Sequence, residues 1–166
     1  MPKVFQLGYV ALGVSDFERT KNYYLETLGT QLVETDSDNA AYLSIGYAHH
    51  DIVLKPSSEQ SLLHLGYQLN RGADLDAFAR DLTDLGLSPE IKSDSQPGVS
   101  RLVEVDVVGG NVMQFYETIE TPAPGFARKG IAPLNLGHIA IVSPDTPKLV
   151  EFYRDFLGFH PTAQLG

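Results

Sequence analysis

The stretch QLGYVALGVSDFERTKNYYLETLG, residues 6–29, decides the fold because the chain repeats it twice. The second copy is HLGYQLNRGADLDAFARDLTDLG, residues 64–86, and the third is NLGHIAIVSPDTPKLVEFYRDFLG, residues 135–158. Each copy places an aromatic ring after Leu-Gly, continues as a β-prone run, and ends in a helix-like stretch that closes on Leu-Gly. The same order found three times at one spacing indicates an internal structural repeat.

Helix boundary signals agree with the repeat and predict helices over residues 15–29, 73–86 and 143–158. Polar residues that suit N-caps open all three stretches, and a glycine that suits the left-handed C-terminal position closes each one. Pro147 lies just inside the third helix, where its fixed φ is compatible with the first turn. The expected N-caps are Ser15 (in a capping box with Glu18), Asp74, and Asp145 or Thr146; the closing glycines are Gly29, Gly86 and Gly158.

Three strand-like segments follow each of the first two helices. In the first unit they are QLVETDS, AAYLSIGY and DIVLKPS; in the second they are SPEIKSD, SRLVEVDVV and NVMQFYET. Gly109-Gly110 suits a tight turn between the last two strands of the second unit. Each unit therefore predicts the order β-α-β-β-β. Because one such unit cannot bury both faces of its sheet, we expect an α+β fold of paired βαβββ modules.

The module boundaries predict two domains. Modules 1–57 and 60–120 form a first domain over residues 1–120, and TPAPGFARKGIAP, residues 121–133, has the composition of a linker. Residues 134–166 then form an incomplete first module of a second domain, with strands over 134–142 and 159–165. Such a partial module has unpaired strand edges and an exposed apolar helix face, so we expect it to self-associate, giving a homo-oligomer.

Composition excludes several functional classes. The chain has 12 basic and 21 acidic side chains, a net charge of -9, and no Lys/Arg cluster, which argues against nucleic-acid or anionic-membrane partners. It has no cysteine, so any metal must be held by oxygen or imidazole ligands. The first residues lack a secretory signal pattern, and no apolar run reaches membrane-spanning length. We therefore expect a cytoplasmic protein.

Paired β-α-β-β-β units with Gly-His in an opening strand and FYRDFLGF in the following helix resemble the vicinal oxygen chelate superfamily. This superfamily includes glyoxalase I, bleomycin-resistance proteins and type I extradiol ring-cleavage dioxygenases. Two units, a linker and a unit that opens with Gly-His resemble the extradiol enzymes in particular. The resemblance implies a non-catalytic N-terminal domain and a catalytic domain in which two His and one Glu hold Fe(II) or Mn(II). It also implies an oxidoreductase of aromatic compound degradation whose substrates are an aromatic vicinal diol and O2.

The resemblance further implies where ligands should lie. The family places one ligand in the opening strand, after Leu-Gly, where this chain has Tyr9, Tyr67 and His138. The other ligand type is a Glu in the last strand, where the second unit has Gln114 and the first offers only Ile52-Val53-Leu54. His138 is therefore the expected first metal ligand of a His/His/Glu triad whose other ligands, like the catalytic residues, are expected beyond Gly166. On this interpretation the 166 residues alone hold no metal and are inactive.

Other readings remain open. The first two units could form a metal-free, bleomycin-resistance-like module that binds a small molecule in the cup between them. A glyoxalase-type isomerase is a weaker alternative, because residues 9, 53, 67 and 114 do not supply its ligands. Glu117 is a poor ligand candidate, since it lies three residues past Gln114, on the opposite face of the strand. His49-His50 is interpreted as part of a hairpin loop and His64 as a surface residue, while His160 is expected either to pack or to be solvated.

Overall fold

The computed structural model describes residues 3–108, 110–121 and 129–162. The first unit contains β1 (Val4–Val14), α1 (Phe17–Asn22) with its π-helical continuation η1 (Tyr23–Leu28), β2 (Gln31–Thr35), β3 (Ala41–Ser44) and β4 (Ile52–Pro56). The second contains β5 (Ser61–Leu69), α2 (Leu75–Asp84), β6 (Glu90–Gln96), β7 (Val99–Asp106) and β8 (Val112–Tyr116). The third contains α3 (Thr146–Glu151) and its π-helical continuation η2 (Phe152–Phe156). The predicted order β-α-β-β-β is confirmed for both complete units.

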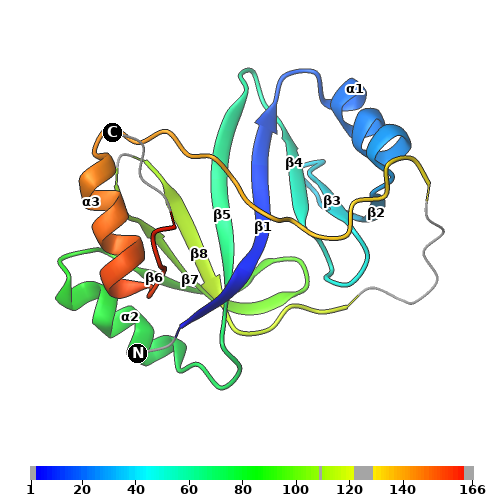
Figure 1. Cartoon of the computed structure of the whole chain (residues 1–166). Helices are drawn as coiled ribbons and strands as arrows, with labels where there is room; N and C mark the ends of the chain where they lie inside the picture. The colour runs from blue at the N-terminus through cyan, green and yellow to red at the C-terminus, as the bar shows by residue number, and fades with distance from the viewer. Residues whose placement is uncertain (1–2, 109, 122–128, 163–166) are drawn as a thin grey trace.

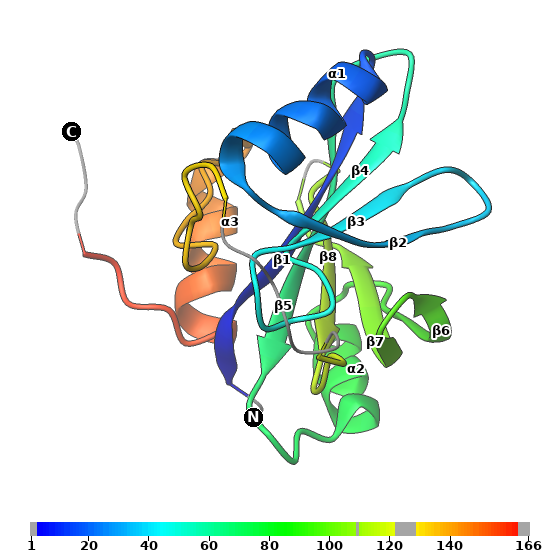
Figure 2. The ribbon, with the colours of Figure 1, turned by 90° about the vertical axis from the view of Figure 1, so that its right-hand side faces the viewer.

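The two units share one eight-stranded sheet of order β2-β3-β4-β1-β5-β8-β7-β6. They meet where β1 pairs with β5 in antiparallel orientation, while β1 runs parallel to β4 and β5 runs parallel to β8. Figures 1 and 2 show the helices gathered on one side of this twisted sheet. We call that side the helix face and the opposite side the open face.

The predicted helix caps are confirmed with one correction. The side chain of Asp74 accepts hydrogen bonds from the amides of Asp76 and Ala77, and that of Asp145 accepts one from Lys148. In the first unit Asp16, and not the predicted Ser15, caps the helix by accepting from the Arg19 amide. The glycines that close the helices have the predicted left-handed backbone, with φ of 79°, 80° and 77° at Gly29, Gly86 and Gly158.

The main hydrophobic core lies on the helix face. It joins apolar residues of both units to the inner sides of the helices, and Phe78 and Leu82 of α2 are almost completely buried in it. Burying one side chain of this size contributes about 1.5–3 kcal/mol. Two smaller clusters lie on the open face; their buried members are Tyr9, Val99, Leu102 and Tyr116 in one, and Ala11, Ala40, Tyr42 and Val53 in the other.

The predicted strand over residues 134–142 is wrong, because this segment pairs with no strand among the residues that the structure describes. The chain first docks against the end of the first helix, where the Ile131 and Ala132 amides donate to the Thr27 and Leu28 carbonyls. It then crosses the helix face in front of β1 (Figure 1). Leu136, Ile139 and Ile141 pack on the main core there. A β-prone sequence becomes a strand only when a neighbouring strand is available to satisfy its backbone.

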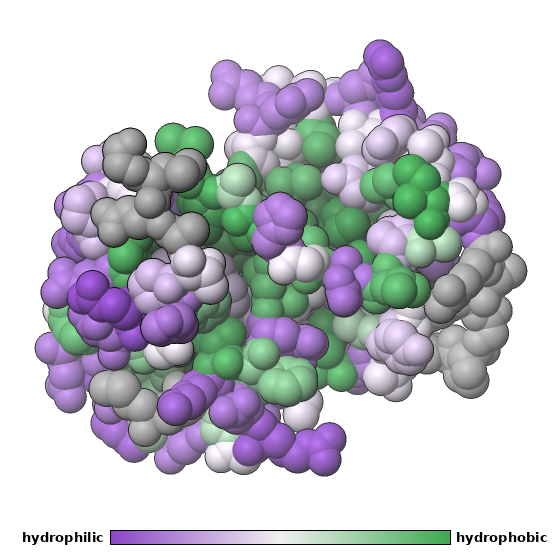
Figure 3. Space-filling view, viewed as in Figure 1, coloured by the Kyte–Doolittle hydropathy of each residue, from purple (hydrophilic) through white to green (hydrophobic). Residues whose placement is uncertain are grey.

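We also expected the helix of the third unit to expose its apolar face, but this face is buried. Leu149, Phe152, Phe156 and Leu157 are each at most 8% exposed, because α3 and η2 dock on the main core. α3 lies next to α2 in Figure 1, and apolar residues gather in the middle of the same face in Figure 3. Of the second predicted strand, residues 159–162 show no strand pairing, and residues 163–165 lie outside the described residues.

Two further expectations concern the turn at Gly109-Gly110 and membrane segments. Gly110 has a φ of 79°, as a tight turn requires, whereas residue 109 lies outside the described residues. Within the part of the chain that the structure describes, no helix is long and apolar enough to cross a membrane.

Candidate functional site

The pairing of β1 with β5 relates the two units by an approximate twofold axis. Val10 faces Leu65, and on either side of this pair Tyr9 faces Gly66 and Ala11 faces His64. Rotation about this axis exchanges the two strands, so that His64 takes the place of Tyr9 and Ala11 takes the place of Gly66. Tyr9 and His64 therefore occupy equivalent positions on β1 and β5, and Ala11 is equivalent to Gly66.

The strands that flank β1 and β5, which are β4 and β8, complete a set of four positions on the open face. Val53 of β4 faces Ala11, and Gln114 of β8 faces Gly66, so that Val53 and Gln114 are equivalent as well. Residues that face one another across neighbouring strands point to the same side of a sheet. Tyr9, Val53, His64 and Gln114 thus stand where two βαβββ units bring their opening and closing strands together.

This register corrects the predicted role of Tyr67. Aligning the Leu-Gly-aromatic motifs makes Tyr67 the counterpart of Tyr9, but in the sheet Tyr67 faces Leu7 and belongs to the core of the helix face. The counterpart of Tyr9 is His64, three residues earlier. The first domain therefore retains one ligand-capable imidazole among the four positions. The motif could not reveal this, because the register depends on pairing between distant strands and on an irregularity between Leu7 and Tyr9.

A chain of hydrogen bonds crosses the open face from Tyr9. Its hydroxyl donates to Oε1 of Gln114 at 2.5 Å, and Nε2 of Gln114 donates to Oε2 of Glu104 at 2.7 Å. Nζ of Lys92 donates to Oε1 of Glu104 at 2.6 Å. Although burial raises the pKa of Glu104, the hydrogen bonds from Lys92 and Gln114 bring it below its usual value. Gly66 makes room for this arrangement, since a Cβ there would lie 2.4 Å from the Tyr9 ring.

His49 and His50 lie in the loop between β3 and β4, as predicted, but both imidazoles are buried on the open face. Their Nδ1 atoms are 3.1 Å apart, and Nε2 of His50 lies 3.2 Å from the Gln96 amide nitrogen. The His50 ring packs against Tyr9 with ring centroids 4.6 Å apart. Burial, with smaller effects from His49 and His64, lowers the pKa of His50 to about 3. The imidazole of His50 is therefore neutral near pH 7.

His64 is not the surface residue that we expected. Its ring lies edge-on to Tyr9 with centroids 5.9 Å apart, and burial lowers its pKa to about 4. Its Nε2 atom is buried and has no hydrogen-bond partner among the described residues. A neutral imidazole in this state is chemically able to ligate a metal, but it needs further ligands nearby.

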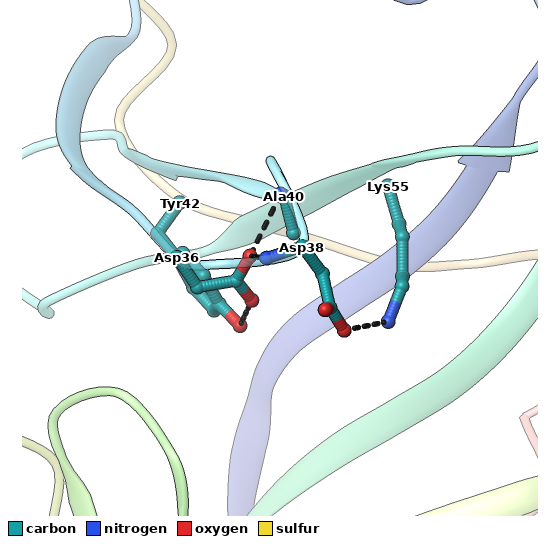
Figure 4. A network of polar contacts seen from close by, with 5 residues as sticks. All are labelled: Asp36, Asp38, Ala40, Tyr42 and Lys55. Atoms are coloured by element: carbon teal, nitrogen blue, oxygen red, sulfur yellow. Dashed lines mark hydrogen bonds and ion pairs between the residues drawn. The ribbon is translucent and has the colours of Figure 1, made fainter.

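The edge of the open face at the first unit is held by a compact polar network (Figure 4). Asp36 accepts hydrogen bonds from the amides of Asp38 and Ala40 and from the Tyr42 hydroxyl, and Lys55 pairs with Asp38 at 3.0 Å. Burial raises the pKa of Asp36, but these hydrogen bonds lower it more, so that it stays ionised near pH 7. The network fixes Tyr42 over His50, with ring centroids 5.1 Å apart.

The open face does not have the donor set of a metal centre. Tyr9 and Gln114 hydrogen-bond to each other, Val53 offers no donor atom, and the nearby carboxylate of Glu104 is held by Lys92 and Gln114. In residues 3–108, 110–121 and 129–162, no three His, Cys, Asp or Glu side chains form a group that could hold a metal ion. Glu117 accepts a hydrogen bond from the Gly72 amide at 2.6 Å, which gives it a structural role.

His138 lies in the extended segment of the third unit and is exposed. It lines a pocket of roughly 400 Å³ on the helix face, together with side chains of the first domain and of α3 and η2. The polar side chains of that pocket besides His138 are Tyr67, Ser143, Thr146 and Tyr153, so the pocket holds neither a carboxylate nor a second imidazole. His138 can therefore supply one metal ligand, and the pocket adds no carboxylate or second imidazole to it. His160 is exposed, which selects the solvated one of its two expected environments.

Comparison with protein families gives a match to the Glyoxalase/Bleomycin resistance protein/Dioxygenase superfamily over residues 6–106. Among curated proteins, the biphenyl-2,3-diol 1,2-dioxygenase of Sphingomonas paucimobilis is 24% identical over 164 residues, covering 92% of this chain and 55% of its own length. The manganese-dependent 2,3-dihydroxybiphenyl 1,2-dioxygenase of Geobacillus genomosp. 3 is 20% identical, with coverage of 95% and 54%. The chain thus spans about half the length of the curated relatives it matches.

Solved structures show the same fold. The 2,3-dioxygenase LapB from Pseudomonas sp. KL28 superposes with a TM-score of 0.86 at 20% identity, covering 96% of this chain and 60% of that protein. A catechol 2,3-dioxygenase superposes with a TM-score of 0.76 at 29% identity, covering 95% of this chain and 56% of its own. Since so little of the chain lies outside these matches, they include the third unit as well as the first two.

Proposed function

Because the chain belongs to the Glyoxalase/Bleomycin resistance protein/Dioxygenase superfamily, we propose that it forms the N-terminal half of an extradiol dioxygenase. One observation carries the proposal. All three units, in order, match dioxygenases over at least 92% of this chain but only 46–60% of theirs. The proposed reaction opens the ring of an aromatic vicinal diol with O2, and the enzyme acts in aromatic compound degradation.

His138 is the proposed first ligand of the catalytic metal. It follows Leu-Gly in the third unit as Tyr9 does in the first, and its imidazole, unlike the phenol of Tyr9, belongs to the two-His, one-Glu set of the proposed site. Two His and one carboxylate leave open positions on Fe(II) or Mn(II), where a catecholate and O2 can bind side by side. A manganese-dependent relative supports a divalent metal, and Fe(II) is our choice for this protein. The described residues supply one ligand, so no catalytic step is assigned to them.

The first domain, residues 1–120, is proposed to be a metal-free support. Its four positions on the open face are occupied by Tyr9, Val53, His64 and Gln114. Tyr9 and Gln114 hydrogen-bond to each other, and Nε2 of His64 has no partner among the described residues. Residues 121–133 are the proposed connection, and residues 134–166 are proposed to begin the catalytic domain. In the cup between the units, where the bleomycin-resistance-like alternative would place a ligand, the buried rings of Tyr9, Tyr42, Tyr116 and His50 pack against one another.

Self-association remains part of the proposal. Leu134 is 67% exposed and Val142 is 96% exposed, and both lie on the extended segment that pairs with no strand among the described residues. Such a segment favours pairing with a second polypeptide. Sedimentation velocity should give a dimer or larger species for the purified protein. A clean monomer at micromolar concentration would contradict this part.

The function is tested with the natural polypeptide isolated at its native length. We expect O2 uptake with 2,3-dihydroxybiphenyl or catechol after anaerobic loading with Fe(II) or Mn(II). Replacing His138 by Ala should abolish both the uptake and the stoichiometric binding of metal, whereas His160→Ala should preserve them. Full activity and metal content in His138→Ala would refute the assignment of the ligand.

A further inference from the structure

Two tyrosine hydroxyls join the first domain to the third unit. The hydroxyl oxygens of Tyr67, on β5, and Tyr153, on η2, are 2.7 Å apart, and their rings are 6.1 Å apart in an edge-on arrangement. Tyr67 is only 3% exposed. Tyr153 is half-buried, so the hydrogen bond is partly shielded from water. We call these two residues the tyrosine pair.

Aromatic packing surrounds the tyrosine pair. Phe156 of η2 lies against Phe78 of α2 with ring centroids 5.5 Å apart. Phe159 contacts both members of the pair, at centroid distances of 6.2 Å from Tyr67 and 5.1 Å from Tyr153, and its amide donates to the Tyr153 carbonyl. The stretch that follows α3 thus packs on the first domain through the rings of Phe156 and Phe159, and the tyrosine pair adds a hydrogen bond between the two.

His138 lies in the wall of the same pocket as the tyrosine pair. Tyr67, His138, Tyr153 and Phe159 all line this pocket, which separates the extended segment from α3. Both sides of the pocket are packed on the main core, through Ile139 and Ile141 on one side and Leu149 on the other. The position of His138 relative to the first domain is therefore set by the docking of the third unit.

We propose that Tyr67 and Tyr153 are positioning residues, which fix the third unit, and His138 with it, against the first domain. The role given to His138 rests on the proposed function, whereas the docking itself does not. The superposition with LapB supports a defined arrangement, because it covers 96% of the chain and so includes the third unit. A domain without a metal then contributes to a metal site by holding its first ligand in place.

Hydrogen exchange of the 166-residue chain, followed by mass spectrometry, tests the docking. Tyr67→Phe and Tyr153→Phe should each speed exchange over residues 146–157 by about two- to tenfold, the effect of losing one hydrogen bond. Exchange in β1 and β5 should stay at the wild-type rate. The double variant should exchange more slowly than the product of the two single effects predicts, because it leaves no hydroxyl unpaired.

Tyr42→Phe is the matched control, since it removes another tyrosine hydroxyl that is hydrogen-bonded, but on the open face. It should leave exchange over residues 146–157 unchanged. Wild-type exchange in both single variants would overturn the proposal. An equal acceleration throughout the sheet would also overturn it, because the pair would then act on global stability alone.

Ring signals of His138 in NMR spectra give the second readout. They should shift in Tyr67→Phe and Tyr153→Phe, while those of His49, on the open face, should not. Unchanged His138 signals would overturn the positioning role even if exchange increased. Neither measurement uses a metal or a diol, so a failure of the proposed dioxygenase activity would leave these results unaffected.

Discussion

Tyr9 and His64 occupy equivalent positions on β1 and β5, on the same face of the sheet, with ring centroids 5.9 Å apart. The approximate twofold axis thus relates a phenol to an imidazole on the two central strands, and a valine to a glutamine on the strands that flank them, β4 and β8. Two of these four residues, Tyr9 and Gln114, hydrogen-bond to each other. On the open face, Nε2 of His64 is a buried imidazole nitrogen that has no hydrogen-bond partner among the described residues.

The register predicts that a metal site can be built with two substitutions. Tyr9→His together with Gln114→Glu would place two imidazoles and a carboxylate on one face, a set suited to divalent transition metals. We expect this variant to bind Co(II) at least about tenfold more tightly than the wild-type chain, as followed by titration calorimetry and the visible spectrum of Co(II). The matched control is Tyr67→His with Gln114→Glu, whose new imidazole faces the helix side. Equal binding by both variants would show the register to be wrong.

Acid should destabilise the first domain through its buried histidines. The pKa values of His50 and His64, about 3 and about 4, lie below the ordinary value of 6.5, so the unfolded chain takes up protons first as the pH falls. Above pH 6.5 both imidazoles are neutral in the folded and in the unfolded chain, so they do not lower the free energy of unfolding. As the pH falls below 6.5 towards their folded pKa values, the unfolded chain binds protons that the folded chain does not, and the free energy of unfolding decreases. Asp51 opposes them, because burial raises its pKa to about 6.

We expect a net loss on the order of 2 kcal/mol of unfolding free energy between pH 7 and pH 5. Urea unfolding across this range measures it. His64→Leu removes one of the two groups together with its unpaired Nε2 atom, and should flatten the dependence without loss of stability at pH 7. The same slope in His64→Leu as in the wild type would exclude His64 as a cause.

Gly66→Ala should destabilise the fold by about 1–3 kcal/mol, the usual effect of overpacking a filled site. Its Cβ would lie 2.4 Å from the Tyr9 ring, which is buried and hydrogen-bonded to Gln114 and therefore cannot move freely. Gly137→Ala is the control, since the nearest atom to a Cβ there is 3.8 Å away. Thermal unfolding compares the melting temperatures of the two variants, and Gly66→Ala should have the lower one. Equal melting temperatures would contradict the packing described for Tyr9.

The third unit should contribute to the stability of the first domain. Phe156→Ala should lower the free energy of unfolding by about 3 kcal/mol, because Phe156 is buried against Phe78. Tyr47→Ala, at a side chain that is 82% exposed, should change it by less than about 0.5 kcal/mol. A chain shortened to residues 1–121 should melt at a lower temperature than the 166-residue chain. An unchanged melting temperature would mean that the third unit docks without stabilising the sheet.

Local signals in the sequence predicted the fold well, and long-range pairing explains where prediction failed. Asp74, Asp145 and Gly29 are recognisable because caps depend on residues only a few positions away. The counterpart of Tyr9 could not be read from the motif, because His64 reaches that place through pairing between β1 and β5. The segment 134–142 has the composition of a strand, but strand formation requires a partner strand, and its apolar residues pack on the helix face instead.

The most direct measurement is oxygen consumption by the purified 166-residue chain with 2,3-dihydroxybiphenyl, after anaerobic incubation with Fe(II) and, separately, with Mn(II). Metal content is determined on the same samples after gel filtration. Because the described residues contain one ligand of the proposed triad, His138, and no group of three side chains that could hold a metal, we predict no oxygen uptake above the buffer rate and no stoichiometric metal. Sustained ring opening by these 166 residues, with about one metal ion per chain, would contradict the assignment of the chain as the metal-free half of a dioxygenase.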